Sequence, residues 1–394
     1  MELHGFTPVE EIDLRIKSIQ SRMPDAALDG ILISTNANIY YTAGRVFNGY
    51  VFIPAQGRPI YLVRRPNNIE GDGVTYIHKP EQIAEVLKDK GYAIPENMGL
   101  EMATTDYLTI QRLMAAFPEC RSVDASAILR QSRSVKTNYE VEQIRKSALK
   151  HCIVYNKIPK LYDEGMSDIE LQIEIEHASR LEGCLGQFRV AGDSMEIHMG
   201  SVIAGNNADV PTPYDFSMGG AGLVPSMPVG ADGTIIKPGM TVMVDTNGDF
   251  DGYMSDLTRV YSLGNLSELA LKAHRCSIDI CRMIEKEARP GVKASALYEM
   301  AVELAKSRSL EHYFMGYSQK AGFIGHGVGI EINELPVLSP KSRDIIALNN
   351  VIALEPKFVI PETGAVGIEN TYVVKADGLK CLTEMTEEII NLEK

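Results

Sequence analysis

Five residues in the second half of the chain have the types and spacing of a metal site. Asp245 and Asp256 stand eleven residues apart, on either side of a glycine-rich turn in the segment TVMVDTNGDFDGYMSDLTR. His326 lies inside a GHGVG segment, and Glu355 and Glu369 follow it, fourteen residues apart. A hard divalent cation prefers anionic oxygen, and one imidazole among four carboxylates favours manganese, cobalt, iron or zinc over a metal held by thiolates.

Four carboxylates exceed what one cation needs. Two neighbouring cations can share carboxylates as bridges, which reduces the repulsion among the acids and lets one hydroxide lie between both metals. We therefore expect two divalent ions. Each residue alone also has an ordinary explanation: aspartates are common in hairpin turns, His326 stands between two glycines, and Glu355 precedes Pro356 at the end of a strand. The joint pattern favours the metal site.

The elements that position these residues follow an α/β region at the N-terminus. Ile12, Ile16 and Ile19 share one face of a predicted helix. Short apolar runs that begin at residues 30, 50, 59 and 98 are separated by glycine, proline or asparagine and predict strands, and residues 104–116 predict another helix. We therefore expect an α/β layer domain over residues 1–130.

The metal ligands fall in a second predicted domain, residues 131–394. Capping boxes that begin at Thr137 and Ser167 predict a helix over residues 138–162 and a further helix after it. The further helix alternates apolar and polar residues at period two, which alone favours a strand. Its cap and its glutamates favour a helix, which is our prediction.

The same order of elements recurs after the strand-rich region that holds the two aspartates. We expect Asn265-x-x-Glu268 to cap a long helix and residues 294–307 to form another, before further strands. Helix, helix and strands therefore appear twice, with two ligands in the first half and three in the second. Ligands drawn from two similar units meet most easily at their shared seam, so the metals should lie between the halves. The expected fold is α+β with a pseudo-twofold repeat.

Composition excludes several classes of function. The 394 residues are 45% hydrophobic, enough for a large core, and a net charge of −13 with no basic run argues against nucleic acid or an anionic membrane surface as a partner. The six cysteines are scattered without zinc-ribbon spacing and indicate reduced thiols. The sequence has no apolar leader and no run of about 18 apolar residues, so we expect a cytoplasmic protein.

On these residues the sequence resembles the creatinase, prolidase and aminopeptidase P group, whose catalytic domain has the pita-bread fold. The resemblance rests on the opening pattern RIKSIQSRMPDAALDGILISTNANIYYTAG, the linker SRSVKTNYEVEQIRKSA, and the ligand order Asp, Asp, His, Glu, Glu with its separations. It covers nearly the whole chain. It implies a creatinase/prolidase-like α/β domain over residues 1–130, a pita-bread metallohydrolase domain over residues 131–394, and a homodimer, which is common among relatives.

The resemblance also implies a role for each ligand. Asp245 would hold one metal, Asp256 and Glu369 would bridge the pair, and His326 and Glu355 would complete the second. The bridging hydroxide would be the nucleophile on a peptide carbonyl, and the metals would stabilise the developing oxyanion. Glu355 is also the candidate general base, because a carboxylate beside activated water can accept its proton.

Three residues depart from the peptidase pattern of this group. Thr212 directly follows a proline where histidine is usual, Asn333 stands seven residues beyond the metal histidine where a second histidine is usual, and Gly367 stands where many members have arginine. Threonine and asparagine can donate to an oxyanion, but neither can carry a proton near neutral pH as histidine does. We therefore treat Thr212 and Asn333 as weaker catalytic replacements and expect slower turnover or another substrate.

Three other features have two readings each. His198 could reach the site and supply the missing imidazole, or it could be an ordinary strand histidine with a backbone partner. Thr258 shares a strand face with Asp256, where its hydroxyl could steady a ligand, or it could be there because β-branched residues suit strands. Residues 217–233 form an insertion that could cover the cleft and restrict substrate length, or be a plain surface loop.

Two functional classes follow. The first is an exopeptidase dependent on manganese, cobalt or zinc, of the dipeptidase or aminopeptidase type, that hydrolyses Xaa-Pro bonds in small peptides. The second is a relative without peptidase activity, either a hydrolase or lyase for a small nitrogenous compound or a metal-poor binding protein, which Thr212, Asn333 and Gly367 favour. Neither class needs an organic cofactor.

Overall fold

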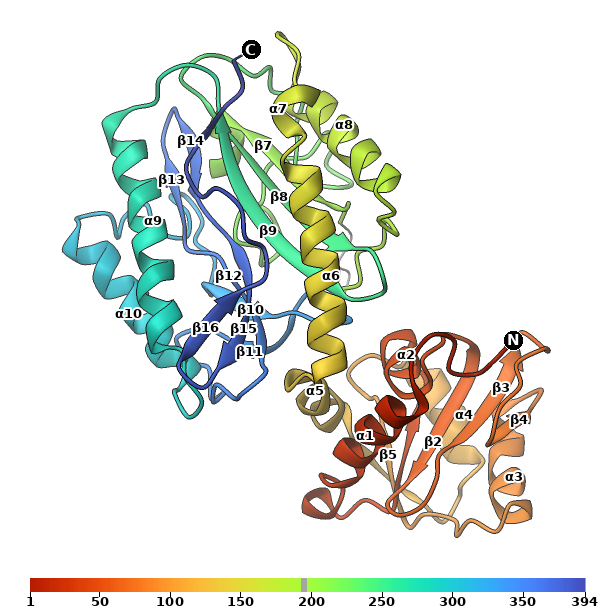
Figure 1. The fold of residues 1–394 in the computed structure, drawn as a ribbon. Helices are drawn as coiled ribbons and strands as arrows, with labels where there is room; N and C mark the ends of the chain where they lie inside the picture. The colour runs from red at the N-terminus through yellow and green to blue at the C-terminus, as the bar shows by residue number, and fades with distance from the viewer. Residues whose placement is uncertain (193–196, 394) are drawn as a thin grey trace. The chain divides into compact units, whose positions relative to one another are not determined.

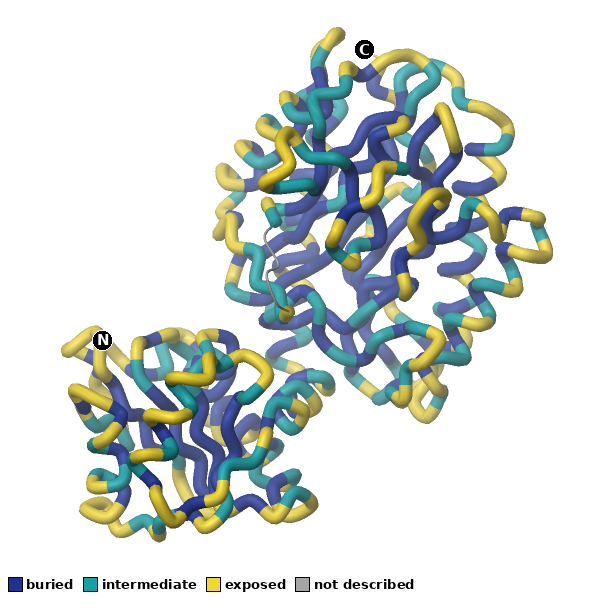
Figure 2. The backbone as a smooth tube through the Cα atoms, turned by 180° about the vertical axis from the view of Figure 1, so that it is seen from behind, coloured by how far each residue is buried: buried dark blue, intermediate teal, exposed yellow. Residues whose placement is uncertain are grey.

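The computed structural model describes residues 1–192 and 197–393, and the chain forms two compact units, Met1–Arg133 and Ser134–Lys394. The domain boundary predicted from the sequence, after residue 130, falls inside helix α5 (Ser126–Ser134), the last element of the first unit. Each unit has its own sheets and its own apolar core, which Figure 2 shows as buried strands beneath exposed loops and helix faces.

The first unit is an α/β layer built on one mixed six-stranded sheet (Figure 1). Its strands are β1 (Gly30–Ile33), β2 (Asn48–Pro54), β3 (Ile60–Arg65), β4 (Val74–Tyr76), β5 (Asn97–Leu100) and β6 (Arg121–Asp124), and its other helices are α1 (Val9–Gln20), α2 (Asn36–Ala43), α3 (Ile83–Asp89) and α4 (Tyr107–Ala115). The strand order is β4-β3-β2-β1-β5-β6. Ile12, Ile16 and Ile19 of α1 are buried, as their shared helix face predicts.

The same order of elements, helices followed by strands, occurs two times in the second unit (Figure 1). In the first half, α6 (Asn138–Tyr155), α7 (Ile158–Leu161) and α8 (Asp168–Leu181) precede β7 (Gly200–Ala204), β8 (Thr241–Asp249) and β9 (Met254–Ser262). In the second half, α9 (Glu268–Glu287) and α10 (Ala294–Ser307) precede β10 (Gly325–Gly327), β11 (Glu334–Val337), β12 (Val351–Leu354), β13 (Lys357–Ile360), β14 (Gly364–Gly367), β15 (Asn370–Lys375), β16 (Gly378–Cys381) and β17 (Ile390–Asn391). The predicted repeat of helix, helix and strands is confirmed.

Apolar cores lie on both sides of the strands of the second unit, and a smaller apolar cluster that includes Met243 and Val359 lies between strands of the two halves. One core packs α9 and α10 against the strands of the second half and includes Ile280 and Leu354. The other packs α6 and α8 against β7, β8 and β9 and includes Tyr155 and Val244. Most residues of the strands between these layers are therefore buried. Over residues 1–192 and 197–393, no helix combines the length and the apolarity that crossing a bilayer would require.

Both predicted capping boxes are present, but two predicted helix ends are wrong. The helix expected over residues 138–162 ends at Tyr155 and resumes as α7. Pro159 lies in the first turn of α7, where its missing N–H is tolerated, whereas inside a continuous helix it would remove a hydrogen bond and clash with the preceding turn. Helix α9 is capped by Ser267, whose hydroxyl accepts from the N–H of Ala270, and not by Asn265.

Gly200 begins β7 beside the part of β8 that carries Asp245. Its φ is +144°, and a Cβ there would stand 2.3 Å from the carbonyl oxygen of Asp245 and 2.4 Å from Cα of Thr246. We expect Gly200→Ala to displace β8 and to lower the free energy of unfolding by about 1–3 kcal/mol, the usual cost of overpacking. Urea unfolding followed by circular dichroism measures the change.

The matched control is Gly233→Ala. Gly233 also has a positive φ, +90°, but no atom lies within 4 Å of the place where its Cβ would stand. Backbone strain is therefore common to both variants, and only Gly200→Ala adds a collision with β8. Equal losses of stability in the two variants would contradict the proposed role of Gly200.

Candidate metal centre

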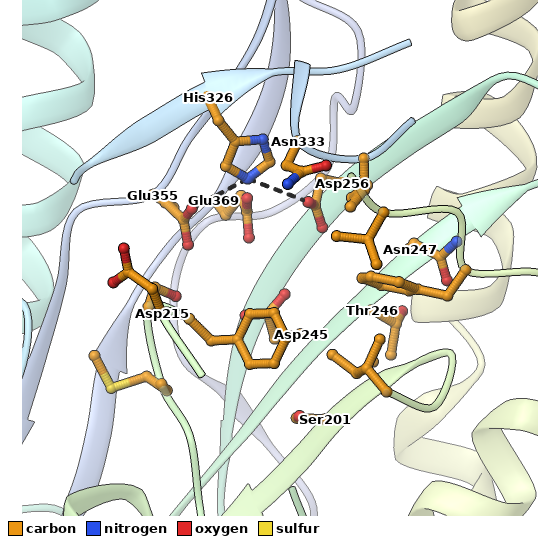
Figure 3. Close-up of a pocket in the computed structure, with 18 of the residues that line it drawn as sticks. Ser201, Asp215, Asp245, Thr246, Asn247, Asp256, His326, Asn333, Glu355 and Glu369 are labelled. Atoms are coloured by element: carbon orange, nitrogen blue, oxygen red, sulfur yellow. Dashed lines mark ion pairs between the residues drawn. The ribbon is translucent and has the colours of Figure 1, made fainter. Parts of the chain in front are cut away.

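The structure brings all five predicted ligands to one site (Figure 3). Asp245 on β8 and Asp256 on β9 come from the first half of the unit, whereas His326 on β10, Glu355 directly after β12 and Glu369 directly before β15 come from the second. Their ligand atoms form two groups, each within 4.8 Å: Asp256, His326 and Glu369 in one, and Asp245, Glu355 and Glu369 in the other. Glu369 belongs to both groups.

Strand register explains how the two aspartates meet. In the antiparallel pair β8-β9, Asp256 lies opposite Asn247, which is two residues beyond Asp245. Side chains alternate between the faces of a strand, so Asp245, Asn247 and Asp256 point to the same face. The eleven-residue spacing in the sequence therefore makes the two carboxylates diagonal neighbours across a hairpin.

The seam between the halves is held by hydrogen bonds from β9 to the β15 region. The N–H of Glu369 donates to the carbonyl of Thr258 at 3.2 Å. The hydroxyl of Thr371 accepts from the N–H of Asp256 and donates to its carbonyl, each at 2.8 Å. β9 and the segment before β15 share one isolated antiparallel bridge, between Thr258 and Glu369, and belong to different sheets, so the hydroxyl of Thr371 adds contacts that a strand ladder would otherwise provide. These bonds fix Asp256 and Glu369 side by side.

His326 is oriented as a metal-binding histidine is. Its Nδ1 lies 3.1 Å from the carbonyl oxygen of Gly327, which can only accept, so Nδ1 carries the proton. Nε2 then faces the carboxylates, 3.4 Å from Oε1 of Glu355 and 3.7 Å from Oδ2 of Asp256. A backbone carbonyl on one ring nitrogen fixes the ring so that the other can bind a cation.

Glu369 supplies a direct test of whether a cation fits this group. Its Oε2 accepts from the hydroxyl of Thr258 at 2.7 Å, which confirms that Thr258 steadies a predicted ligand. Its Oε1 is buried and has no hydrogen-bond partner among the described residues. An unpaired buried carboxylate oxygen is costly, and a divalent ion held by Asp256, His326 and Glu369 would satisfy it. One cation therefore fits.

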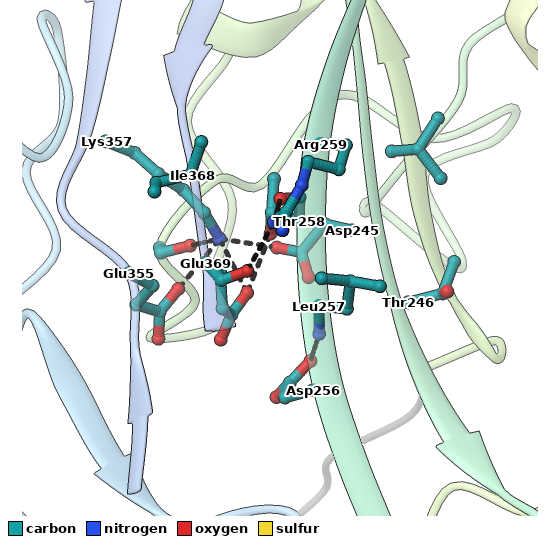
Figure 4. Close-up of polar contacts among 12 residues, drawn as sticks. Asp245, Thr246, Asp256, Leu257, Thr258, Arg259, Glu355, Lys357, Ile368 and Glu369 are labelled. Carbon is teal, nitrogen blue, oxygen red and sulfur yellow. Dashed lines mark hydrogen bonds and ion pairs between the residues drawn. The ribbon is translucent and has the colours of Figure 1, made fainter. Parts of the chain in front are cut away.

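The second group of ligands is already filled by a residue that the sequence analysis does not predict. Lys357, the first residue of β13, has a side chain with 0% exposure. Its ammonium donates to Oδ2 of Asp245 at 2.7 Å, to Oε2 of Glu355 at 2.8 Å and to Oε2 of Glu369 at 3.3 Å (Figure 4). The hydroxyl of Ser217 accepts a fourth contact at 2.7 Å. A second metal ion does not fit these ligands while Lys357 holds them.

Burial and neighbouring charges oppose each other at this ion pair. Burial by itself raises the pKa of Glu355, but the charges and hydrogen bonds of Lys357 and His326 outweigh it and lower the pKa to about 2. Burial disfavours the charged form of Lys357 as well, but the adjoining carboxylates raise its pKa well above the usual lysine value. Both groups are therefore ionised at neutral pH.

The remaining ligands carry more negative charge than these cations offset. Burial and the neighbouring carboxylates raise the pKa of Asp256 to about 8 and that of Glu369 well above its usual range. Burial lowers the pKa of His326, but Glu355 and Asp256 outweigh burial and raise it to about 9. Protons therefore take the place of a cation in the metal-free site, and a divalent ion would displace them.

A pocket opens onto the metal ligands from one side (Figure 3). Its apolar wall is formed by Phe188, Val190, Ile197, Phe216, Phe323 and Ile332. Its polar lining includes Ser201, Asp215, Asn247 and Asn333. The described residues of the lining include no lysine or arginine. Lys357 is close to the carboxylates, but its side chain is fully buried and does not reach the pocket surface.

Asn333 lines this pocket, but its amide is engaged elsewhere. Nδ2 donates to the carbonyl of Ala191 at 2.6 Å, and Oδ1 accepts from the N–H of Ala191 at 2.7 Å. The side chain therefore fixes the segment that contains Phe188 and Val190 against the site. Its expected role as an oxyanion donor stays a prediction, and the contacts indicate a role in shaping the pocket wall.

Thr212 and His198 lie outside the described pocket lining. The hydroxyl of Thr212 donates to the carbonyl of Pro228 at 2.8 Å and thereby holds the insertion of residues 217–233. His198 is exposed. The bond of Thr212 to Pro228 and the exposure of His198 do not favour the catalytic roles expected from the sequence.

The start of the insertion is part of the site. Ser217 and Met218 are buried and line the pocket, whereas Leu223 and Val224 near the middle of the insertion are exposed. The insertion therefore contributes to the wall at its first two residues, is exposed at residues 223–226, and is buried again at residues 229–231.

Gly367 lies directly opposite Lys357 in the β13-β14 hairpin. A Cβ at Gly367 would stand 2.7 Å from the carbonyl oxygen of Pro356 and 3.0 Å from Cα of Lys357. A larger residue would therefore force the two strands apart at the point where Lys357 enters the site. The resemblance implies an arginine at the position of Gly367, on β14. The cationic side chain of this hairpin is Lys357 instead, which lies on β13.

Comparison with known proteins agrees with this fold. Residues 142–376 match metallopeptidase family M24, and residues 15–135 match the creatinase/prolidase N-terminal domain. The Xaa-Pro dipeptidase of Pyrococcus furiosus is 23% identical over 385 residues, which are 95% of this chain and 99% of that protein. An Xaa-Pro dipeptidase structure from Bacillus anthracis has a TM-score of 0.78 at 20% identity and covers 96% of this chain and 99% of its own. An X-Pro aminopeptidase structure from Thermotoga maritima has a TM-score of 0.75 at 21% identity and covers 95% of this chain and 99% of its own.

The chain belongs to metallopeptidase family M24. It is thus a metallohydrolase by family, and the resemblance to the prolidase and aminopeptidase P group is confirmed. The expected architecture, a creatinase-type α/β unit followed by a pita-bread unit, is confirmed as well. Neighbours named as dipeptidases and as aminopeptidases share this fold, so the fold does not separate the two activities.

Thr258→Val removes the hydroxyl that donates to Glu369 while it keeps the branched shape of the side chain. We expect the affinity for Mn²⁺ to fall by about 10–100-fold, the usual cost of losing a hydrogen bond that orients a metal ligand. Competition with a fluorescent chelator measures the affinity. Thr258→Ser keeps the hydroxyl and should bind as the wild type does; an equal loss in both variants would show that packing, and not the hydrogen bond, is responsible.

Proposed function

We propose that this protein is a metal-dependent exopeptidase that hydrolyses the Xaa-Pro bond of small peptides. The observation that supports it best is the combination of Asp256, His326 and Glu369 with an unsatisfied carboxylate oxygen at the base of an apolar pocket. Two relatives that each align with 95% of this chain are named Xaa-Pro dipeptidase.

The chain's own residues have defined tasks in this proposal. A divalent ion, when bound, supplies a Lewis acid for water and for the peptide carbonyl. Lys357 and His326 keep Glu355 ionised with a pKa of about 2, which makes it a weak base; with its Oε1 3.4 Å from Nε2 of His326, it can accept a hydrogen bond from the attacking water and orient that water. Thr258 and the carbonyl of Gly327 hold Glu369 and His326 in their orientations.

The pocket lining supports peptides longer than two residues. Asp215 places a carboxylate in the lining, where it suits the free α-ammonium of a peptide. A dipeptide would also bring its terminal carboxylate close to the site, and the described lining offers it no lysine or arginine. The apolar wall suits the proline ring. We therefore infer an aminopeptidase preference, Xaa-Pro-Yaa over Xaa-Pro.

A second candidate is a hydrolase for another small nitrogenous compound. It is favoured by Thr212, which bonds to Pro228, and by Asn333, which bonds to Ala191, since neither provides the proton-carrying histidine of the peptidase pattern. The metal-poor binding protein also considered is disfavoured by the unpaired Oε1 of Glu369, which calls for a cation. The identity of the metal, a homodimer and a cytoplasmic location stay predictions.

Release of the N-terminal residue from matched Xaa-Pro and Xaa-Pro-Yaa peptides tests the proposal. Purified apoprotein is reconstituted separately with Mn²⁺, Co²⁺ and Zn²⁺, and the new amino group is followed by chromatography. We expect metal-dependent cleavage with a higher kcat/KM on the longer peptides, because the lining offers no ionic partner to a nearby carboxylate.

Asp256→Asn is the matched control, since it removes one ligand charge and keeps the size of the side chain. Cleavage should fall by at least about 100-fold in this variant, in the range found when a main electrostatic contribution to catalysis is lost. Metal-loaded wild type that cleaves no peptide of the panel would contradict the peptidase proposal and leave the small-molecule hydrolase.

His198 provides a separate prediction about the missing imidazole. Because its side chain is exposed and outside the described pocket lining, we expect His198→Ala to leave kcat and KM unchanged. Asn333→Ala is the comparison, since it removes both bonds to Ala191 and should raise KM by loosening the pocket wall. A loss of kcat in His198→Ala would contradict the placement and restore the histidine as a catalytic candidate.

A further inference from the structure

The two glutamates of the site divide their oxygens between two positions. Oε2 of Glu355 and Oε2 of Glu369 both accept from the ammonium of Lys357. Oε1 of Glu355 faces Nε2 of His326 at 3.4 Å, and Oε1 of Glu369 is buried without a partner. Each carboxylate thus offers one oxygen to a cation that is part of the chain and keeps the other for a second position.

Lys357 fills its position completely. An ammonium has three N–H donors, and Nζ has four acceptors within 3.3 Å: Asp245, Glu355, Glu369 and Ser217. No donor is therefore left over for water. Three of these acceptors are the three members of the second ligand group. The ammonium occupies the position at Asp245 where the resemblance implies one of the two metal ions, and it also takes Glu355, which the resemblance assigns to the other ion.

A metal ion and this ammonium cannot share the same oxygens. Transition-metal ions bind carboxylate oxygen at about 2.0–2.2 Å, whereas Nζ already lies 2.7–3.3 Å from the same three atoms. The two cations would be separated by a few ångströms in a buried site, where like charges repel strongly. Either the metal or the ammonium takes these ligands.

The backbone commits Lys357 to this position. It begins β13, and its cross-strand partner is Gly367, the residue whose missing Cβ allows the strands to approach at this point. Its N–H contacts the sulfur of Met315 at 3.3 Å, and the following strand residues Phe358 and Val359 are buried. The side chain enters the site from behind the carboxylates, with no exposed surface.

We propose that Lys357 is a built-in cation that replaces one of the two metal ions, so that this site takes a single divalent ion, at Asp256, His326 and Glu369. Lys357 is a positioning residue, because it lies outside the pocket lining and acts through the carboxylates that it holds. Catalysis would then use one Lewis acid and not two, and only this consequence rests on the proposed function.

The number of bound ions tests the inference without any assay of activity. Full-length metal-free protein is saturated with Mn²⁺, freed of excess metal by gel filtration, and analysed for manganese per chain by mass spectrometry. We expect one equivalent in the wild type and two in Lys357→Met, which keeps an apolar stem and removes the ammonium. Electron paramagnetic resonance gives a second readout: an isolated Mn²⁺ signal in the wild type and a spin-coupled pair in the variant.

Lys136→Met is the matched control. Lys136 is also a buried lysine, and its ammonium contacts Glu334 at 2.9 Å, but neither residue belongs to the metal ligands. The control removes an ammonium from beside a buried carboxylate outside the ligand set, so its manganese content should stay at one equivalent. A second equivalent in Lys136→Met would show that any lost lysine recruits metal, and would overturn the assignment.

The other outcomes separate this inference from the proposed function. Two equivalents in the wild type overturn the inference and leave the peptidase proposal intact. No bound manganese overturns the inference, and the peptidase proposal is overturned with it if cobalt and zinc do not bind either. One equivalent without peptide cleavage supports the inference and contradicts the peptidase. A folded Lys357→Met that stays at one equivalent overturns the role of Lys357, and if this variant does not fold, the wild-type count still decides.

Discussion

The repulsion among four carboxylates in a seam that is buried except where the pocket opens is the constraint on which the site depends. Asp245, Asp256, Glu355 and Glu369 come from both halves of the second unit and lie within a few ångströms of one another. Like charges at such distances destabilise a fold unless cations or protons neutralise them. Burial and this repulsion raise the pKa of Asp256 and of Glu369. The ion pairs with Lys357 and His326 neutralise part of the negative charge.

The fold satisfies this constraint by joining two half-units through short hydrogen bonds. One half contributes a hairpin whose register makes its aspartates neighbours, and the other contributes a histidine and two glutamates at strand ends. Thr258 and Thr371 cross the seam with their hydroxyls and connect β9 to the ligand-bearing end of β15. The apolar cores on either side keep water from screening the charges, so each hydrogen bond to a carboxylate matters more than it would at a surface.

The sequence predicts which five candidate side chains gather at one site, because their identity depends on residue type and local spacing. The predicted strands, the capping boxes at Thr137 and Ser167 and the paired helix order follow from local rules too, and they are present. Helix ends were less predictable. Pro159, which lacks an N–H group, interrupts one helix, and the hydroxyl of Ser267 caps another.

Lys357 was beyond prediction for a different reason. Its ammonium contacts Asp245, Glu369 and Ser217, which lie 112, 12 and 140 residues away in the sequence. Only the folded chain brings these groups together. The available signal was a charged residue between Pro356 and the apolar run Phe358, Val359, Ile360. Thr212 shows the converse: its place beside a proline indicated the active site, but its hydroxyl bonds to Pro228 in an insertion whose path the sequence does not specify.

Because the ammonium of Lys357 is covalently part of the chain, it is present from the moment of synthesis. Asp245, Glu355 and Glu369 can therefore be drawn together while the two halves dock, before any ion has been acquired from the surroundings. Ser217 joins the same ammonium, so the start of the insertion is set in place by the same event. Folding and metal binding can therefore be successive steps. In a metal-poor environment the two halves of the second unit can associate first, and the divalent ion can bind afterwards.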